Sequence, residues 1–107
     1  MMELLPSEAR EQLPKLYAQE KIEDPLVYLK FFFPAGHWTW FVTEGESLDG
    51  DFLFYGYVIG SDKEWGYFTL NQLEEINIQN LTVERDLYFT QESFSRCIER
   101  WKLERGG

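Results

Sequence analysis

Hydrophobic and polar residues alternate in several short stretches of this chain, and the pattern predicts an antiparallel sheet. In residues 26–33 one face is wholly apolar and the other is mixed, as in a strand buried on one side. Residues 38–43 repeat the alternation after a Pro-Ala-Gly-His turn, so we expect these two strands to pair antiparallel. Residues 64–70 predict another strand, in which Trp65 faces away from Phe68.

Residues 52–59 are apolar or aromatic at every position except Gly56, which predicts a strand covered on both faces in the middle of the sheet. We expect Gly56 to leave room for a neighbouring aromatic ring. Residues 44–50, which precede this strand, are expected to form an acidic loop. The four strands make a meander, and residues 83–89 suggest a fifth strand.

Three helices are predicted around the sheet. Ser7 is placed to cap the first, which Pro14 ends. Asn71 and Glu74 have the spacing of a capping box before a short helix over residues 72–77. An apolar stripe near the C-terminus predicts a helix that docks on the sheet. The stripe consists of Phe94, Cys97, Ile98 and Trp101.

The fold class is therefore predicted as α+β: an antiparallel sheet of four to five strands, with short N-terminal and middle helices and a C-terminal helix. A chain of 107 residues has room for one hydrophobic core, so we expect a single domain over residues 1–107. Aromatic residues make up 18% of the chain, and such large side chains dominate the energetics of a core or interface.

The formal net charge is −9, and residues 40–91 alone contain ten acidic and two basic residues. This segment would repel phosphate backbones, so we expect no direct nucleic-acid binding and favour a basic protein partner. No apolar run is long enough to span a membrane and no leader pattern is seen, which predicts a cytoplasmic protein without membrane contact. The single cysteine, Cys97, fits a reducing compartment.

Three blocks of the chain follow one another in a specific series: Trp38-Thr39-Trp40, Gly66-Tyr67-Phe68 and Glu84-Arg85-Asp86. With other blocks, in this order, they resemble domain of unknown function family 2958. The resemblance covers roughly residues 3–90 and leaves the last helix outside. It implies a small bacterial or archaeal protein of a kind often carried on mobile elements, and it supplies no activity and no catalytic residues. The acidic loop after Glu44 is shorter than in the family pattern, so a ligand of that loop would be bound differently here.

The most suggestive polar group is Glu84-Arg85-Asp86. On a strand the two acids share one face and Arg85 takes the other. Arg85 could clamp a carboxylate or phosphate with both arms of its guanidinium. The interpretation we favour is structural: an ion pair with Glu44 or Asp51 across the sheet.

The other chemistry-bearing residues have structural explanations. The loop carboxylates could hold Mg²⁺ or Ca²⁺, but their spacing does not match the calcium-loop signature and a solvated loop is favoured. These carboxylates belong to Glu44, Glu46, Asp49 and Asp51. His37 is interpreted as an exposed turn residue, and Cys97 as a packed apolar side chain. We predict no catalytic motif, no metal site and no cofactor.

Aromatic side chains on one sheet face are the remaining candidates for a binding surface. If helices leave this face bare it would form a large apolar patch, although burial in the core is favoured. The face is predicted to carry Tyr28, Phe32, Phe41, Tyr55 and Tyr57, opposite Phe31, Trp40 and Phe54.

The leading functional hypothesis is a non-enzymatic interaction module that presents an acidic rim over residues 44–64, with Tyr55 and Tyr57 beside it, to a basic protein. A variant is a nucleic-acid mimic that inhibits a DNA- or RNA-binding protein. The alternative class is a metal-assisted hydrolase built on Arg85 and nearby carboxylates. Its ligands or base would come from Glu44, Asp51, Glu84 and Asp86.

Overall fold

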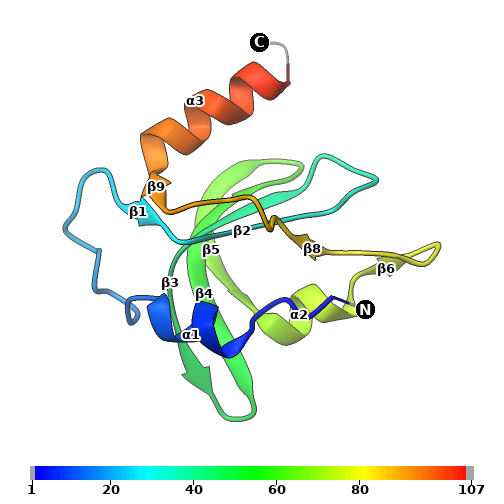
Figure 1. Cartoon of the computed structure of the whole chain (residues 1–107), viewed down its shortest axis with the longest axis horizontal. Coiled ribbons are helices and arrows are strands. Elements are labelled where there is room, and N and C mark those ends of the chain that lie inside the picture. The colour runs from blue at the N-terminus through cyan, green and yellow to red at the C-terminus, as the bar shows by residue number, and fades with distance from the viewer. Residues whose placement is uncertain (1, 106–107) are drawn as a thin grey trace.

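The computed structural model describes residues 2–105 and contains a five-stranded antiparallel sheet with helices on both faces (Figure 1). The strand order is β5-β4-β3-β2-β8. The strands are β2 (Leu29–Phe32), β3 (Thr39–Leu48), β4 (Asp51–Ile59), β5 (Lys63–Thr69) and β8 (Glu84–Arg85). The helices are α1 (Ser7–Gln12), α2 (Leu70–Glu75) and α3 (Phe94–Glu104). Two small ribbons complete the fold: β1 (Leu26–Val27) with β9 (Glu92–Ser93), and β6 (Asn77–Ile78) with β7 (Leu81–Thr82).

The predicted α+β class and the four-strand meander are confirmed. β2, β3, β4 and β5 pair in sequence order, and β8 returns to the outer side of β2. The fifth strand exists but covers only Glu84–Arg85. β4 has a partner on each side, so residues 52–59 form an inner strand as predicted, although β3 is the central one of the five strands.

The predicted acidic loop over residues 44–50 is also wrong, because β3 continues to Leu48. The hairpin to β4 closes at Asp49 and Gly50, which both have positive φ, 36° and 81°. Such two-residue turns favour an Asp-Gly pair, since their twist matches that of the flanking strands.

A β-bulge between Val42 and Glu44 turns β3 partway along its length. Before the bulge Phe41 opposes Tyr57, and after it Glu44 opposes Tyr55. One extra residue reverses the faces that later residues occupy. Glu44 therefore lies on the same face as Phe41, whereas uninterrupted alternation would place it on the opposite one.

The helix caps differ from the predicted ones. The N-cap of α1 is Pro6, so Ser7 is the first helical residue and makes no cap. α2 begins at Leu70, and its capping box joins Thr69 to Gln72 instead of Asn71 to Glu74.

Two core clusters lie on the two faces of the sheet. The first joins one face to α1, α2 and the N-terminal segment, and includes Leu5, Phe31, Trp40, Phe54 and Leu73. The second joins the other face to α3, and includes Val27, Phe41, Ile59 and Cys97. Figure 1 shows α3 well apart from α1 and α2, which lie toward the opposite end of the view. On the second face Tyr67 remains 51% exposed, so α3 covers only part of that face.

Candidate functional site

The structure does not bring the predicted polar residues together. Glu84 and Arg85 form the outer strand β8, beyond β2, while Glu44 lies on β3 and Asp51 starts β4. The predicted ion pair of Arg85 with Glu44 or Asp51 is wrong, because those carboxylates bind backbone N–H groups in other parts of the fold. Within residues 2–105, no three His, Cys, Asp or Glu side chains are grouped in a way that could hold a metal ion.

The Glu84-Arg85-Asp86 block borders the sheet edge. Glu84 and Arg85 oppose Phe32 and Phe31, so their side chains take opposite faces as predicted. Asp86 pairs with Lys30, with 3.7 Å between carboxylate and ammonium. Arg85 points to the face of the first core cluster, and its Nε is buried without a hydrogen-bond partner in the described chain. This arrangement leaves no convergent clamp for an anion.

Asp51 has a structural role at the start of α2. Its Oδ1 accepts hydrogen bonds from the backbone N–H groups of Phe52 at 2.7 Å and Asn71 at 3.0 Å. Asn71 lies in the first turn of α2, where backbone N–H groups lack helical partners and a carboxylate is favourable.

Glu44 is the buried anchor of the segment that follows α1. Its side chain is on the partly covered sheet face, and only 4% of the residue is exposed. Oε1 accepts from the backbone N–H of Tyr17 and Oε2 from that of Gln19, both at 2.8 Å. Hydrogen bonds to an ionised acceptor are short and strong, so this carboxylate holds residues 15–22 against the sheet.

Gln19 completes the attachment of this segment. Its side-chain amide donates to the carbonyls of Leu26 and Thr43, both at 2.9 Å, and its carbonyl oxygen accepts from Leu26 N at 2.7 Å. Gln19 is buried, and its bond to Thr43 forms away from solvent, while the two bonds to Leu26 are partly buried. Residues 15–25 thereby become one wall of a groove, with β4 and β5 as the other.

The groove has a volume of about 440 Å³ and four aromatic side chains in its lining. They are Tyr17, Tyr55, Trp65 and Tyr67. Tyr55 stacks on Trp65 with 5.8 Å between ring centroids and contacts Tyr67 at 4.9 Å. Trp65 and Tyr67 remain 36% and 51% exposed, so their rings are accessible from solvent.

Carboxylates add negative charge to this aromatic groove. Glu20, Glu23 and Glu44 line it, and Glu20 and Glu23 are exposed. Among the residues that the structure describes, no Lys, Arg or His lines the groove. The negative faces of aromatic rings and nearby carboxylates both favour a cation.

Hydrogen bonding with Tyr17 raises the pKa of Tyr67 to about 12, and Tyr55 and Glu44 contribute in the same direction. We expect an ultraviolet titration of the protein to show a late step from the Tyr67 phenol. In Tyr17→Phe this late step should move toward the ordinary range, because the hydrogen-bond partner is gone. Tyr88→Phe is the control, since Tyr88 is 95% exposed and outside the groove. A late step that persists in Tyr17→Phe would contradict this assignment.

A second, wider hollow of about 730 Å³ continues beyond Trp65 toward α3. Trp65 packs against Phe94 at 4.7 Å, and both rings contact Tyr57. Tyr57 lies on the same sheet face as Phe41, as predicted, and belongs to this group of rings. Phe32 and Phe41 also lie on this sheet face, whereas Tyr28 packs against the first core cluster.

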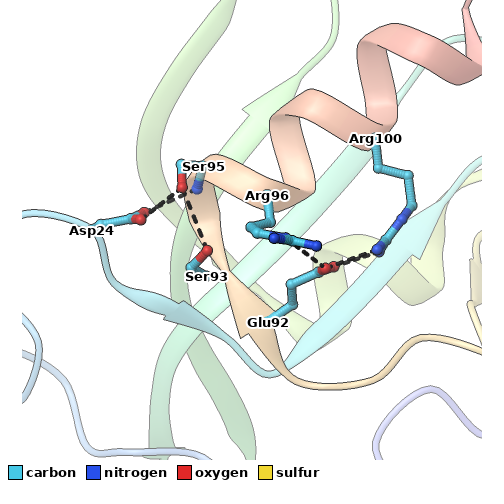
Figure 2. A network of polar contacts seen from close by, with 6 residues as sticks. All are labelled: Asp24, Glu92, Ser93, Ser95, Arg96 and Arg100. Carbon is cyan, nitrogen blue, oxygen red and sulfur yellow. Dashed lines mark hydrogen bonds and ion pairs between the residues drawn. The ribbon is translucent and has the colours of Figure 1, made fainter.

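A polar network fastens the start of α3 beside this hollow (Figure 2). Asp24 accepts from the Ser95 hydroxyl at 2.7 Å and from its N–H at 2.9 Å, and these bonds lower the pKa of Asp24. Glu92 binds Arg100 and lies 3.7 Å from Arg96. The network joins β9 and α3 to the segment before β1, so it fixes the position of Phe94 at the start of α3.

The remaining candidates behave as predicted. His37 is exposed in its turn, where Nδ1 contacts Arg105. Cys97 is buried on α3, and burial raises the pKa of its thiol to about 12, so it stays protonated near neutral pH. No helix within residues 2–105 is long and apolar enough to cross a membrane.

Comparison with known protein families gives a match. A family model described as a protein of unknown function (DUF2958) matches residues 4–101. The chain belongs to the DUF2958 family. The match reaches into α3, so the prediction that the last helix lies outside the resemblance is wrong. No curated protein and no solved structure matches this DUF2958 chain.

Sequence reasoning on this DUF2958 chain missed most of the groove. It selected Tyr55 and Glu44 but not Tyr17, Trp65 or Tyr67. One signal was present: the Asp-Gly pair marks a hairpin, which would have extended the second strand through Glu44.

Proposed function

We propose that this protein is a non-enzymatic interaction module that takes a cationic side chain of a basic protein partner into the groove. The observation that carries the proposal is the lining itself, with four aromatic residues, three carboxylates and no basic side chain in the described chain. A Lys or Arg head placed over Tyr or Trp rings is attracted by their electron-rich faces.

The buried and the exposed carboxylates of the groove have different roles. Glu44 is committed to backbone N–H groups, so it shapes the wall and its charge is already partnered. Glu20 and Glu23 are exposed at the rim, where they would attract a basic partner and speed its association. The exposed carboxylates that line the groove therefore come from the segment before β1, outside the predicted rim over residues 44–64.

The two other hypotheses have less support. A hydrolase built on Arg85 would need its carboxylates to converge, and Glu44 and Asp51 lie elsewhere in the sheet. A nucleic-acid mimic would need free carboxylates in a phosphate-like row, but several acids are bound within the fold. These include Glu44, Asp51, Asp86 and Glu92.

The direct test uses a synthetic peptide of about eight residues that alternates Arg and Thr, because Thr favours an extended chain. We expect binding by calorimetry at physiological salt, and no comparable binding of a peptide with neutral citrulline in place of Arg. Trp65→Ala should weaken binding about tenfold, because it removes the most favourable ring for a cation. Tyr88→Ala is the matched aromatic control, and its affinity should be unchanged.

The rim carboxylates provide a second comparison. Glu20→Gln with Glu23→Gln should weaken binding several-fold, by an amount that shrinks as salt increases. Glu8→Gln with Glu11→Gln on α1 is the control, because it changes the net charge by the same amount away from the groove. The proposal is contradicted if the folded Trp65→Ala protein binds as tightly as the unmodified one, or if the citrulline peptide binds equally well.

A further inference from the structure

β5 forms one outer edge of the sheet. It is seven residues long and pairs with β4, and no other strand of residues 2–105 lies beside it. Most of β5 is exposed, including Trp65 and Tyr67. An open edge strand carries unpaired N–H and C=O groups that can pair with another chain.

The pairing pattern shows which backbone groups of β3 face β4. Phe33 N–H donates to Trp38 O at 3.0 Å, so these two residues form a hydrogen-bonded pair. Such pairs alternate along antiparallel strands, which makes Phe31 and Trp40 the next one. Phe41 must then direct its backbone groups to β4. A second hydrogen bond supports this assignment. Lys30 lies opposite Phe41, and its carbonyl accepts from the N–H of Asp86, which follows β8, so Lys30 directs its backbone groups away from β3.

The same alternation carries across to β5. Phe41 opposes Tyr57, so these two exchange hydrogen bonds, and the next bonded pair, between β4 and β5, is Gly56 with Gly66. The residues on either side of Gly66 must point their N–H and C=O groups out of the sheet. These residues are Trp65 and Tyr67.

Trp65 and Tyr67 therefore have two roles at one place. Their side chains line the cation-binding groove, and their backbone groups form the free edge. A strand added here would have alternate side chains on the groove face, about 5 Å from those of Trp65 and Tyr67. Space on the other face is open, because a Cβ built at Gly66 would meet nothing within 4 Å.

We propose that the partner binds as an extended segment that adds a strand to β5 and places basic side chains, two residues apart, over the groove. This inference rests on the proposed function and names its binding mode. Main-chain bonds to Trp65 and Tyr67 supply affinity, while the aromatic and acidic groove selects Arg or Lys at alternate positions. A second copy of this chain is a poorer occupant, because it would bring Glu20 and Glu23 of one groove toward those of the other.

The test uses the Arg-Thr peptide in three forms: unmodified, with N-methylated Arg residues, and with N-methylated Thr residues. Only alternate N–H groups of an added strand face its neighbour. One methylated form should therefore lose about tenfold in affinity while the other binds like the parent. Loss on Arg methylation indicates antiparallel addition, and loss on Thr methylation indicates parallel addition.

Hydrogen exchange provides the second measurement. In the free protein the amides of Trp65 and Tyr67 should exchange quickly and that of Gly66 slowly, since of these three only Gly66 directs its N–H to β4. Saturation with the unmodified peptide should slow the hydrogen exchange of the Trp65 and Tyr67 amides. This protection, together with a loss confined to one methylated form, supports strand addition.

The other outcomes are distinguishable. Binding that depends on Trp65 but shows no such protection, or equal affinities of both methylated forms, overturns strand addition and leaves the proposed function standing. Absence of Trp65-dependent binding overturns both. Protection of Trp65 and Tyr67 without peptide, in a sample that sediments as a dimer, makes a second copy the occupant and also overturns this inference.

Discussion

Replacing Gly56 with alanine should lower the free energy of unfolding by about 3 kcal/mol. A Cβ at this position would collide with the backbone carbonyl oxygen of Phe41, and would lie 2.9 Å from the Phe41 carbonyl carbon and 3.0 Å from Val42 Cα. Backbone atoms in the middle of a sheet cannot move aside as the end of a side chain can. The close approach occurs next to the bulge in β3. The prediction that Gly56 admits an aromatic ring is therefore wrong, because backbone occupies the space.

Gly66→Ala is the control for this prediction. Gly66 lies directly opposite Gly56 on β5, and a Cβ there would meet no atom within 4 Å. We expect its free energy of unfolding, from urea denaturation, to change by no more than about 0.5 kcal/mol, with a slight gain from reduced backbone freedom in the unfolded chain. Equal losses in the two variants would show that glycine itself is required in both strands, and would contradict the steric explanation.

Glu44→Ala should lower the free energy of unfolding by about 2–4 kcal/mol, since it removes two charge-assisted hydrogen bonds and leaves two N–H donors without an acceptor. The donors are those of Tyr17 and Gln19, each 2.8 Å from the carboxylate. Hydrogen exchange should accelerate first at these two amides, because the segment loses its attachment to β3. Binding of the Arg-Thr peptide should fall as well, since the groove loses a wall.

Glu46→Ala is the matched control, two residues farther along β3. Glu46 is exposed and its carboxylate accepts one longer bond, 3.3 Å from Leu16 N. We expect a loss of less than about 1 kcal/mol by urea denaturation. Similar losses in the two variants would mean that general negative charge on β3 matters more than the specific anchor.

The alternation of apolar residues was enough to predict the meander and the faces of its strands. The prediction worked for Trp65 and Phe68 because side-chain direction in a strand follows from sequence parity alone. It did not extend to Glu44, which was assigned to a loop, and parity alone would give the wrong face there, since a bulge inserts one residue. The N-cap of α2 is Thr69 and not Asn71, because β5 ends at Thr69. The spacing of nearby residues does not show where a strand ends.

The candidate site was less predictable than the fold. Tyr17 reaches the groove through a left-handed backbone, φ 72°, and through a hydrogen bond to a residue 27 positions away. Gln19 binds Leu26 and Thr43 only after the sheet has formed. Nothing in residues 15–24 alone indicates the bonds to Glu44 and Thr43, because these residues lie on a strand far along the chain.

The sequence by itself determined the α+β class, the meander, the apolar stripe of α3 and the excess of negative charge, because each depends on residue types or on local periodicity. Only the tertiary structure decided that α3 covers part of one sheet face, and that Glu44 and Gln19 hold a distant segment over the rest. The groove forms where residues 17–25, β3 and the β4–β5 pair come together, and long-range packing determines that these segments are neighbours. The same packing leaves β5 at the sheet edge, with Trp65 and Tyr67 available to a partner.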